Sequence, residues 1–141
     1  MEIRPLRMDE PGEDDVSAVA ALARAESWPT FADPTLLRRL ASAPGTVTLV
    51  AVAATPSSRV VGFAHALSNG HHAYLSVMAV DRAMRGYGVG RQLVEAILAR
   101  SGVERMDLLS VPESEGFYDR LPSRRLPGYR LFPRRRAEPA Q

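Results

Sequence analysis

The most constraining feature of this sequence is a glycine-rich stretch that lies between an apolar strand and an amphipathic helix. It reads Ala79-Val80-Asp81-Arg82-Ala83-Met84-Arg85-Gly86-Tyr87-Gly88-Val89-Gly90-Arg91. Its three alternating glycines permit a tight turn, so that successive amides at the start of the helix can point toward one anion. The helix dipole adds to this attraction, and Arg85 and Arg91 offer forked donors that suit phosphate oxygens. The stretch predicts a cradle for a pyrophosphate group, although the glycines alone fit a tight turn without a ligand equally well.

Hydrophobic periodicity predicts strands and helices on both sides of this stretch. The expected strands are residues 2–8, 46–54, 60–67, 73–80, 103–111 and 129–132. The expected helices are residues 16–26, 34–40, 89–100 and 114–121. Asp14 or Asp15 offers an N-cap for the first helix, Asp33 caps the second, and Gly102 closes the third. This order of elements predicts an α/β fold in which a mixed sheet carries helices on both faces.

Length and composition narrow the class of protein further. The 141 residues fit one domain, and the absence of cysteine excludes disulfides, thiolate metal sites and cysteine nucleophiles. The apolar runs are far shorter than the roughly 20 residues that a membrane span requires. The first 15 residues are too acidic and too polar for a secretory signal. We therefore expect a cytoplasmic protein that does not enter a membrane.

The charge of the chain is polarised toward its C-terminal end. Seven arginines in residues 120–141 stand against one acid, Glu138, although the formal net charge is only +2. A nucleic-acid-binding module would need a basic stripe with stacking aromatic residues, and the small net charge and acidic beginning argue against it. We expect residues 134–141 to form a flexible arginine-rich tail behind a single domain of residues 1–133.

The glycine-rich stretch differs from two common phosphate-binding motifs. It lies in mid-chain without the βαβ surroundings of a dinucleotide fingerprint, and it lacks the Gly-Lys-Ser/Thr ending of a Walker loop. It resembles instead the acyl-CoA pyrophosphate loop of the GNAT superfamily of N-acetyltransferases. In that loop an arginine or glutamine is followed by two residues, a glycine, one residue, and a glycine or alanine. Arg85, Gly88 and Gly90 match this pattern.

The residues around the loop extend this resemblance. Val80 stands five positions before Arg85, Leu93 follows in place, and Phe117-Tyr118 lies on a short helix after the next strand. The resemblance implies a GNAT acyl-CoA N-acyltransferase fold with a mixed, mostly antiparallel central sheet and helices on both faces. It also implies that the strand ending at Val80 splays from the strand beginning near Val103, which opens a cleft for the cofactor.

The resemblance implies a direct transfer of the acetyl group of acetyl-CoA to a primary amine of a small molecule or peptide, without a metal. The implied partners are acetyl-CoA and the amine acceptor, with no nucleic acid and no membrane. A homodimer formed through the C-terminal strands is a further implication. The alternative is a non-catalytic acyl-CoA-binding or protein-interaction module on the same fold.

The resemblance also assigns residues to the cofactor. Backbone groups of the strand would bind the pantetheine arm, amides of the loop would bind the diphosphate, and Ser110 would partly replace a family asparagine that is Val111 here. The expected cofactor-binding residues are Met78, Ala79, Val80, Arg85, Gly86, Tyr87, Gly88, Val89, Gly90, Arg91 and Ser110. A second departure is Pro122-Ser123, which stands where the family has Gly-Phe, so we expect the closing hairpin of residues 124–132 to differ in shape.

Three residues are candidates for proton transfer. Tyr118 matches the tyrosine that protonates the departing thiolate in the family, whereas an aromatic side chain packed under the sheet is the structural alternative. His72 and Glu26 are candidates for the base that receives the proton of the amine. His72 also fits a turn or surface histidine, and Glu26 an exposed helix end. A water chain, or a small neutral fraction of the amine, would serve in place of either base.

Three aromatic residues are candidates for the acceptor site. Trp28 and Phe31 lie on an expected loop between the first two helices, where relatives shape the acceptor pocket, and an aromatic wall suits an apolar or cationic amine. Core packing of the helix pair explains both residues equally well. Tyr74, at the entrance of the strand that leads to Val80, is expected to project into the same cleft.

Overall fold

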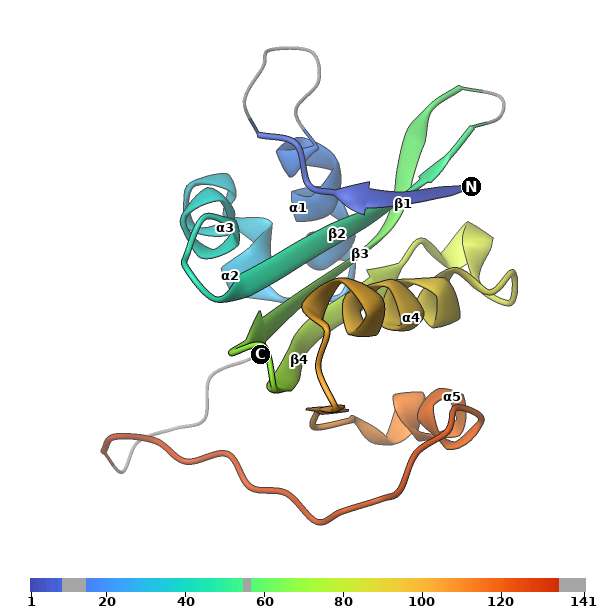
Figure 1. Ribbon diagram of the computed structural model, residues 1–141. Coiled ribbons are helices and arrows are strands. Elements are labelled where there is room, and N and C mark those ends of the chain that lie inside the picture. Colours follow the sequence, from blue (N-terminus) through green and yellow to red (C-terminus); the bar gives the residue numbers. More distant parts are fainter. Residues whose placement is uncertain (9–14, 55–56, 135–141) are drawn as a thin grey trace.

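The computed structural model of the protein describes residues 1–8, 15–54 and 57–134 (Figure 1). Its strands are β1 (Glu2–Pro5), β2 (Thr46–Ala53), β3 (Arg59–Ser68), β4 (His72–Val80) and β5 (Arg105–Asp107). Its helices are α1 (Val16–Ala25), α2 (Pro29–Ala32), α3 (Pro34–Ala41), α4 (Val89–Ser101) and α5 (Glu115–Asp119), with the 3-10 turns η1 (Arg82–Met84) and η2 (Pro112–Ser114). Within the described residues, no helix is long and apolar enough to cross a membrane.

The five strands form one mixed sheet in the order β1-β2-β3-β4-β5, which confirms the predicted α/β fold. Neighbouring strands are antiparallel from β1 to β4, and β5 is parallel to β4. The parallel pair is short: its register joins His72 to Arg105, Ala73 to Met106 and Tyr74 to Asp107. Beyond this point β4 continues to Val80, paired with β3 alone. The two parallel strands therefore splay as expected.

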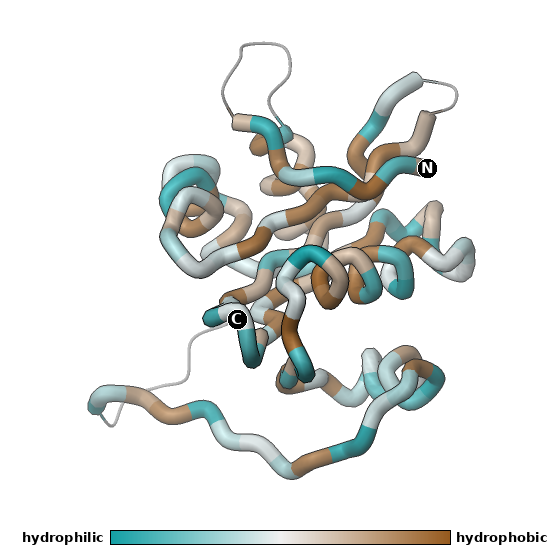
Figure 2. Tube along the Cα trace, viewed as in Figure 1, coloured by the Kyte–Doolittle hydropathy of each residue, from teal (hydrophilic) through white to brown (hydrophobic). Residues whose placement is uncertain are grey.

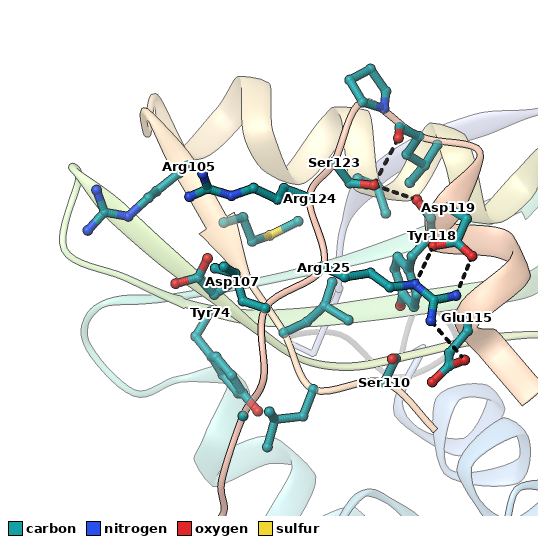
Figure 3. A pocket seen from close by; sticks show the side chains of 18 of the residues that line it. Tyr74, Arg105, Asp107, Ser110, Glu115, Tyr118, Asp119, Ser123, Arg124 and Arg125 are labelled. Carbon is teal, nitrogen blue, oxygen red and sulfur yellow. Dashed lines mark hydrogen bonds and ion pairs between the residues drawn. The ribbon is translucent and has the colours of Figure 1, made fainter. Parts of the chain in front are cut away.

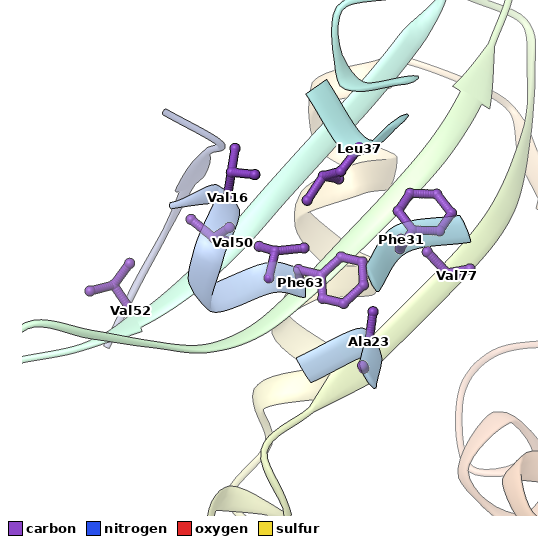
Figure 4. Packing of buried hydrophobic residues seen from close by; sticks show 10 residues of the cluster. Val16, Ala23, Phe31, Leu37, Val50, Val52, Phe63 and Val77 are labelled. Carbon is purple, nitrogen blue, oxygen red and sulfur yellow. The ribbon is translucent and has the colours of Figure 1, made fainter. Parts of the chain in front are cut away.

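Helices cover both faces of the sheet, and each face has its own hydrophobic core. Figure 1 shows α1, α2 and α3 on one face and α4 on the other, and Figure 2 shows hydrophobic residues concentrated along the strands between them. The core under α1 includes Phe31, Leu37, Phe63 and Val77 (Figure 4). Phe63 is fully buried there, so its truncation to alanine should cost about 3–5 kcal/mol.

A β-bulge at Ser76 changes the face that β4 presents to each core. His65 pairs with Val77 and Ala66 pairs with Leu75, which leaves Ser76 without a partner in the register. Leu75 packs on the α4 side of the sheet, whereas Val77 packs on the α1 side. Met78 and Val80 return to the α4 side. At the end of β4, Met78 and Val80 therefore point toward the helix that follows the glycine-rich stretch.

The helix ends follow their sequence signals closely. The Asp33 carboxylate accepts hydrogen bonds from the amides of Thr35 (3.0 Å) and Leu36 (3.4 Å), so the predicted cap of α3 is confirmed. Gly88 opens α4 and Gly102 closes it, both in the left-handed conformation. Gly62 on β3 lets α4 approach the sheet, because a Cβ there would lie 3.1 Å from the Val89 side chain.

The cap predicted for α1 is wrong in its chemistry. Asp15 lies at the N-cap position, but its side chain makes no capping hydrogen bond. Its carboxylate instead accepts hydrogen bonds from the Arg7 amide (2.8 Å) and the Arg4 guanidinium (2.6 Å). A bidentate cation and an amide from the β1 end satisfy this buried carboxylate better than its own helix start. Asp14, the other candidate, lies outside the described residues.

The boundaries of two predicted strands are wrong, and a third predicted strand does not form. The strand predicted at residues 2–8 ends at Pro5, which cannot donate to a ladder, and that predicted at 103–111 shrinks to Arg105–Asp107. The strand predicted at residues 129–132 is absent, and residues 122–134 form neither helix nor strand. Pro127-Gly128 and Pro133 frame this segment and limit its pairing. Of the expected tail, only Arg134 lies within the described residues.

Candidate functional site

The glycine-rich stretch connects β4 to α4 through the turn η1. Asp81 fixes its start, because the carboxylate accepts hydrogen bonds from Arg59 Nη1 (2.6 Å) and the Ala83 amide (3.0 Å). The Arg59 guanidinium, followed by the Ala83 amide, lowers the pKa of Asp81. Gly86 and Gly88 follow with φ of +86° and +81°, a conformation that residues with a side chain rarely adopt. The path of the turn therefore depends on glycine at these two positions.

This turn presents an uncapped helix start to open space. Gly88 is the N-cap of α4, and among the described residues no side chain makes a capping hydrogen bond at this end of the helix. The Gln92 amide is the first to bond back, to the Gly88 carbonyl at 3.1 Å. The amides of Val89–Arg91 lack partners within the helix. A Cβ built on Gly86 or Gly88 meets no atom within 4 Å. A diphosphate fits this geometry, since converging N–H groups and the helix dipole both attract negative charge.

Each of the two arginines predicted to bind phosphate pairs with a carboxylate. Arg85 Nη2 lies 2.5 Å from Glu26 Oε1, and its Nε lies 3.4 Å from the Val80 carbonyl. Arg91 Nε donates to Glu95 Oε1 at 2.9 Å, one turn along α4. The structure thus brings Arg85 and Glu26 together across 59 positions of sequence. Both guanidinium groups stay more than half exposed beside the turn, within reach of an incoming anion.

The gap between β4 and β5 begins where the turn ends. Residues 75–80 of β4 pair with β3 on one side and have no ladder partner on the β5 side. The predicted pantetheine-binding residues Met78, Ala79 and Val80 lie in this part of the strand. An extended molecule placed in the gap would meet unpaired backbone N–H and C=O groups, as an added strand does.

Phe117 and Tyr118 join α5 to the glycine-rich turn. Their rings meet edge to face with centroids 4.9 Å apart. The Phe117 ring lies against Gly90, where a Cβ would approach it to 3.1 Å and the Met78 methyl group to 3.4 Å. Tyr118 packs against the core on the α4 side, and burial raises the pKa of its phenol to about 12. Tyr118 is therefore a protonated group at neutral pH, held beside the first turn of α4.

An open groove of about 1240 Å³ surrounds this region (Figure 3). It is lined by β4, β5, α4, α5 and the C-terminal segment, and it reaches His72, Tyr74, Ser110 and Tyr118. His72 Nε2 lies 2.8 Å from Asp107 Oδ2, a contact between the two parallel strands. Arg91 also lines the groove, so five of the predicted site residues share it.

The groove reaches both faces of the sheet. Met106 packs against the core on the α4 side. Successive strand residues point to opposite faces, so Asp107 and its register partner Tyr74 point to the other face, together with His72. Tyr118 lies on the α4 side. The gap between the strands therefore has a tyrosine on one face and a histidine with a carboxylate on the other.

The C-terminal segment, residues 121–130, forms the outer wall of the groove and is tied to α5 by Arg125. In Figure 3 this side chain turns toward Asp119 and Glu115. Arg125 Nε donates to Asp119 Oδ1 at 2.8 Å, and Arg125 Nη1 lies 3.4 Å from a Glu115 oxygen. The Arg125 guanidinium lowers the pKa of Asp119. Ser123 Oγ lies 2.8 Å from the Tyr118 carbonyl, so the Pro-Ser departure helps to close the end of α5.

Trp28 and Phe31, the other two residues predicted for the acceptor pocket, do not line this groove. Phe31 is only 4% exposed and packs in the core on the α1 side, with its ring 6.0 Å from Phe63 and 5.3 Å from His65. Trp28 is partly buried against the same core. The loop expected there is in fact the short helix α2. Phe31 is therefore a core residue, the alternative to an acceptor-site role. Burial also lowers the pKa of His65, whose Nδ1 lies 2.7 Å from Thr48 Oγ1.

Two residues of the site, Asp107 and Arg125, were not predicted from the sequence. Asp107 was placed within a predicted strand, and nothing in the sequence paired it with His72, because the register of a parallel pair is set by the fold. Arg125 was grouped with the basic C-terminal end. Its spacing of six residues from Asp119 was the one available signal, but six is no helical spacing and predicts no contact.

These features define a class of protein. A splayed parallel pair with an uncapped glycine-rich helix start beside it fits an acyl-CoA-dependent acyltransferase. The family profile described as Acetyltransferase (GNAT) domain matches residues 44–121, more than half of the chain. The chain belongs to the GNAT acetyltransferase family, as the sequence predicted.

Solved structures share the fold over nearly the whole chain. The BH1408 protein from Bacillus halodurans, as a tetramutant, is 20% identical with a TM-score of 0.73, over 94% of this chain and 99% of its own. AAC(6')-Iy, in complex with the bisubstrate analog CoA-S-monomethyl-acetylneamine, is 21% identical with a TM-score of 0.72, over 95% and 97%. The aminoglycoside acetyltransferase meta-AAC0020 from an uncultured soil metagenomic sample, in complex with sisomicin, is 16% identical with a TM-score of 0.70, over 95% and 96%. No curated protein matches the chain significantly in sequence.

Proposed function

We propose that this protein is an N-acetyltransferase that moves the acetyl group of acetyl-CoA to a primary amine of a small molecule or peptide. One observation carries the proposal: the uncapped start of α4, reached through Gly86 and Gly88 with positive φ, lies beside the gap between β4 and β5. One extended ligand would place its diphosphate at this helix start and its pantetheine arm along this gap.

The chain positions this ligand mainly through its backbone. The amides of Val89–Arg91 hold the diphosphate, with Arg85 and Arg91 at its edge. The unpaired backbone of Met78–Val80 holds the arm, and a main-chain N–H there polarises the thioester carbonyl and stabilises the oxyanion that forms on attack. Substitution of these side chains should therefore matter less than a change in the path of the strand or turn.

The reaction needs two proton transfers. The amine nitrogen forms a bond to the thioester carbon, the C–S bond breaks, the nitrogen loses one proton and the sulfur gains one. Tyr118 gives the proton to sulfur: a tyrosine phenol is protonated at neutral pH, and Tyr118, whose pKa burial raises to about 12, remains so. His72 accepts the proton of the amine from the opposite face of the sheet. The amine is itself the nucleophile, so the proposed reaction uses no metal.

The acceptor approaches from the face of the sheet that carries Tyr74 and His72. Tyr74 lines the groove there and offers an aromatic surface to a cationic amine. Two proteins with the same fold were solved with a CoA-linked acetylneamine analog and with sisomicin, which makes amines of this kind the first acceptors to try.

A screen for acetyl transfer tests the proposal. The protein is mixed with acetyl-CoA and a panel of amines, including sisomicin, neamine and short peptides, and release of the free thiol is followed together with the mass of the amine product. An acetylated amine whose formation depends on the protein supports the proposal. Binding of acetyl-CoA without thiol release for any amine would favour the alternative, a non-catalytic acyl-CoA-binding module.

We also propose that two copies of the chain pair through residues 124–132. Tyr129 and Leu131 in this segment are 86% and 89% exposed. Large apolar side chains exposed together often mark a protein–protein interface. The neighbouring strand β5 is an edge strand of the sheet. Pairing of these segments between copies would bury the exposed apolar side chains of Tyr129 and Leu131.

A further inference from the structure

The contact between His72 and Asp107 lies where β4 and β5 part. Tyr74 and Asp107 are the last register pair of the parallel strands, and His72 stands two residues earlier on β4. A pantetheine arm that enters from the Val80 end has its thioester at its inner end, so the reacting carbon approaches this point of divergence. We propose that Asp107 is a positioning residue that holds His72 ready to accept the proton of the amine. This inference rests on the proposed acetyltransferase function.

The geometry fixes which ring nitrogen is available. His72 Nε2 lies 2.8 Å from Asp107 Oδ2, and a carboxylate is an acceptor only, so the imidazole donates through Nε2–H. The neutral ring then carries its lone pair on Nδ1. An imidazole locked in this tautomer loses less freedom when it meets the amine. Asp107 thereby selects the form of His72 that accepts a proton.

The same carboxylate assists the second half of the transfer. When the amine attacks the thioester, its proton moves to Nδ1 and His72 becomes an imidazolium. The negative charge of Asp107 stabilises that cation at hydrogen-bond distance. His72 later releases the proton to water, and the phenol of Tyr118 is restored from water after it has protonated the sulfur. No other reactant is required.

Several charged and titratable groups surround this pair. Tyr74 lies on the same strand, Arg105 is the register partner of His72 on β5, and Arg124 of the C-terminal segment lines the same groove. A second histidine and carboxylate, His71 and Glu104, lie next to the pair, with Nε2 3.8 Å from the carboxylate oxygen and both side chains more exposed. His71 and Glu104 give a matched control for the chemistry of His72 and Asp107.

A double-mutant cycle tests the inference. Asp107→Asn should lower kcat/KM for the amine by about tenfold to a hundredfold, because the imidazolium that forms loses its counter-charge. Asp107→Glu should recover part of the rate, and Glu104→Gln should leave it within about twofold. In a His72→Gln background, Asp107→Asn should have little further effect.

A second readout does not depend on activity. Nitrogen-15 NMR of His72 should show mainly the Nε2–H tautomer in the wild type and a mixture of tautomers in Asp107→Asn. An active wild type whose rate is unchanged by Asp107→Asn would overturn the inference, as would an undiminished Asp107 effect without His72. A wild type that acetylates no amine is a different failure, that of the proposed function, and would remove the catalytic role with it.

Discussion

The guanidinium group of Arg85 lies 2.5 Å from the carboxylate of Glu26, and this ion pair joins the glycine-rich turn to the end of α1. The sequence suggested different tasks for the two residues, phosphate binding for Arg85 and proton acceptance for Glu26. Their contact adds an ion-pair role at the turn to the proton acceptance predicted for Glu26, whose side chain is 25% exposed.

Replacement of Glu26 by glutamine should strengthen acetyl-CoA binding. The substitution frees the Arg85 cation for the diphosphate, and exposed ion pairs are worth up to about 1 kcal/mol, so the affinity should rise about two- to fivefold. Calorimetric titration of acetyl-CoA measures the change. Arg85→Ala is the comparison variant, and it should weaken acetyl-CoA binding. A large loss of kcat in Glu26→Gln, with binding unchanged, would instead identify Glu26 as a base.

Removal of the Tyr118 hydroxyl should slow the transfer step. Tyr118→Phe keeps the ring against Phe117 but cannot protonate the thiolate, so kcat should fall by about a hundredfold while acetyl-CoA affinity stays near that of the wild type. Thiol release under saturating acetyl-CoA measures this loss. Retention of the full rate would leave Tyr118 as a packing residue.

The pH dependence of stability gives an independent check on Tyr118. Its pKa is raised from 10.0 to about 12 by burial, so the folded state disfavours the phenolate. Tyr118 therefore contributes stability that is fully present below pH ~10, its pKa in the unfolded chain. This contribution is lost as the pH rises from ~10 to ~12. Tyr118→Phe should lose less stability across this window than the wild type does, as urea denaturation at several pH values would show.

Ser27 occupies a backbone position that favours glycine. Its φ is +60°. At this end of α1 the Ser27 amide donates a hydrogen bond to the Arg24 carbonyl and the Trp28 amide donates one to the Ala23 carbonyl, both 3.0 Å. Ser27→Gly should therefore stabilise the protein by about 1 kcal/mol. Ser42→Gly is a matched control at the end of α3, where φ is −90°. It should destabilise by about 0.5–1 kcal/mol, and a gain in both variants would contradict the argument.

The proposed dimer makes a prediction about mass in solution. The wild type should sediment as a dimer at micromolar concentration, and Leu131→Asp should sediment as a monomer, because a charge would be buried at the paired segments. Leu67→Gln on β3 is the control, since Leu67 is also exposed but is not part of residues 124–132. A monomeric wild type, or dissociation by the control variant, would exclude this interface.

Local signals in the sequence predicted most of the fold. The Asp33-Pro34 start of α3, the glycines at both ends of α4 and the short apolar runs of β2 and β3 each depend on residues that are close together in the chain. The predicted strand at residues 129–132 failed for the opposite reason. Its apolar residues favour a strand, but a strand also needs a paired neighbour, and none of the described strands pairs with residues 129–132.

The site was predictable only in its local part. Gly86, Gly88 and Tyr118 were found because their spacing and flanks carry a signature. The pairs Arg85 with Glu26 and His72 with Asp107 join residues 59 and 35 positions apart, and no spacing rule connects them. Trp28 and Phe31 were assigned from their position between helices, and the side-chain packing that buries Phe31 follows from the tertiary fold.

The central claim is that the uncapped, glycine-rich start of α4 binds the diphosphate of acetyl-CoA, and calorimetric titration tests it most directly. Gly88→Ala and Gly102→Ala are compared with the wild type, because both glycines are left-handed, both have open space at Cβ, and they lie at opposite ends of α4. Each substitution should cost about 1–2 kcal/mol of stability.

We predict micromolar binding of acetyl-CoA to the wild type and to Gly102→Ala, binding at least about tenfold weaker in Gly88→Ala, and no comparable binding of ATP or NAD. Absence of binding to a folded wild type, or equal loss in the two glycine variants, would contradict the account.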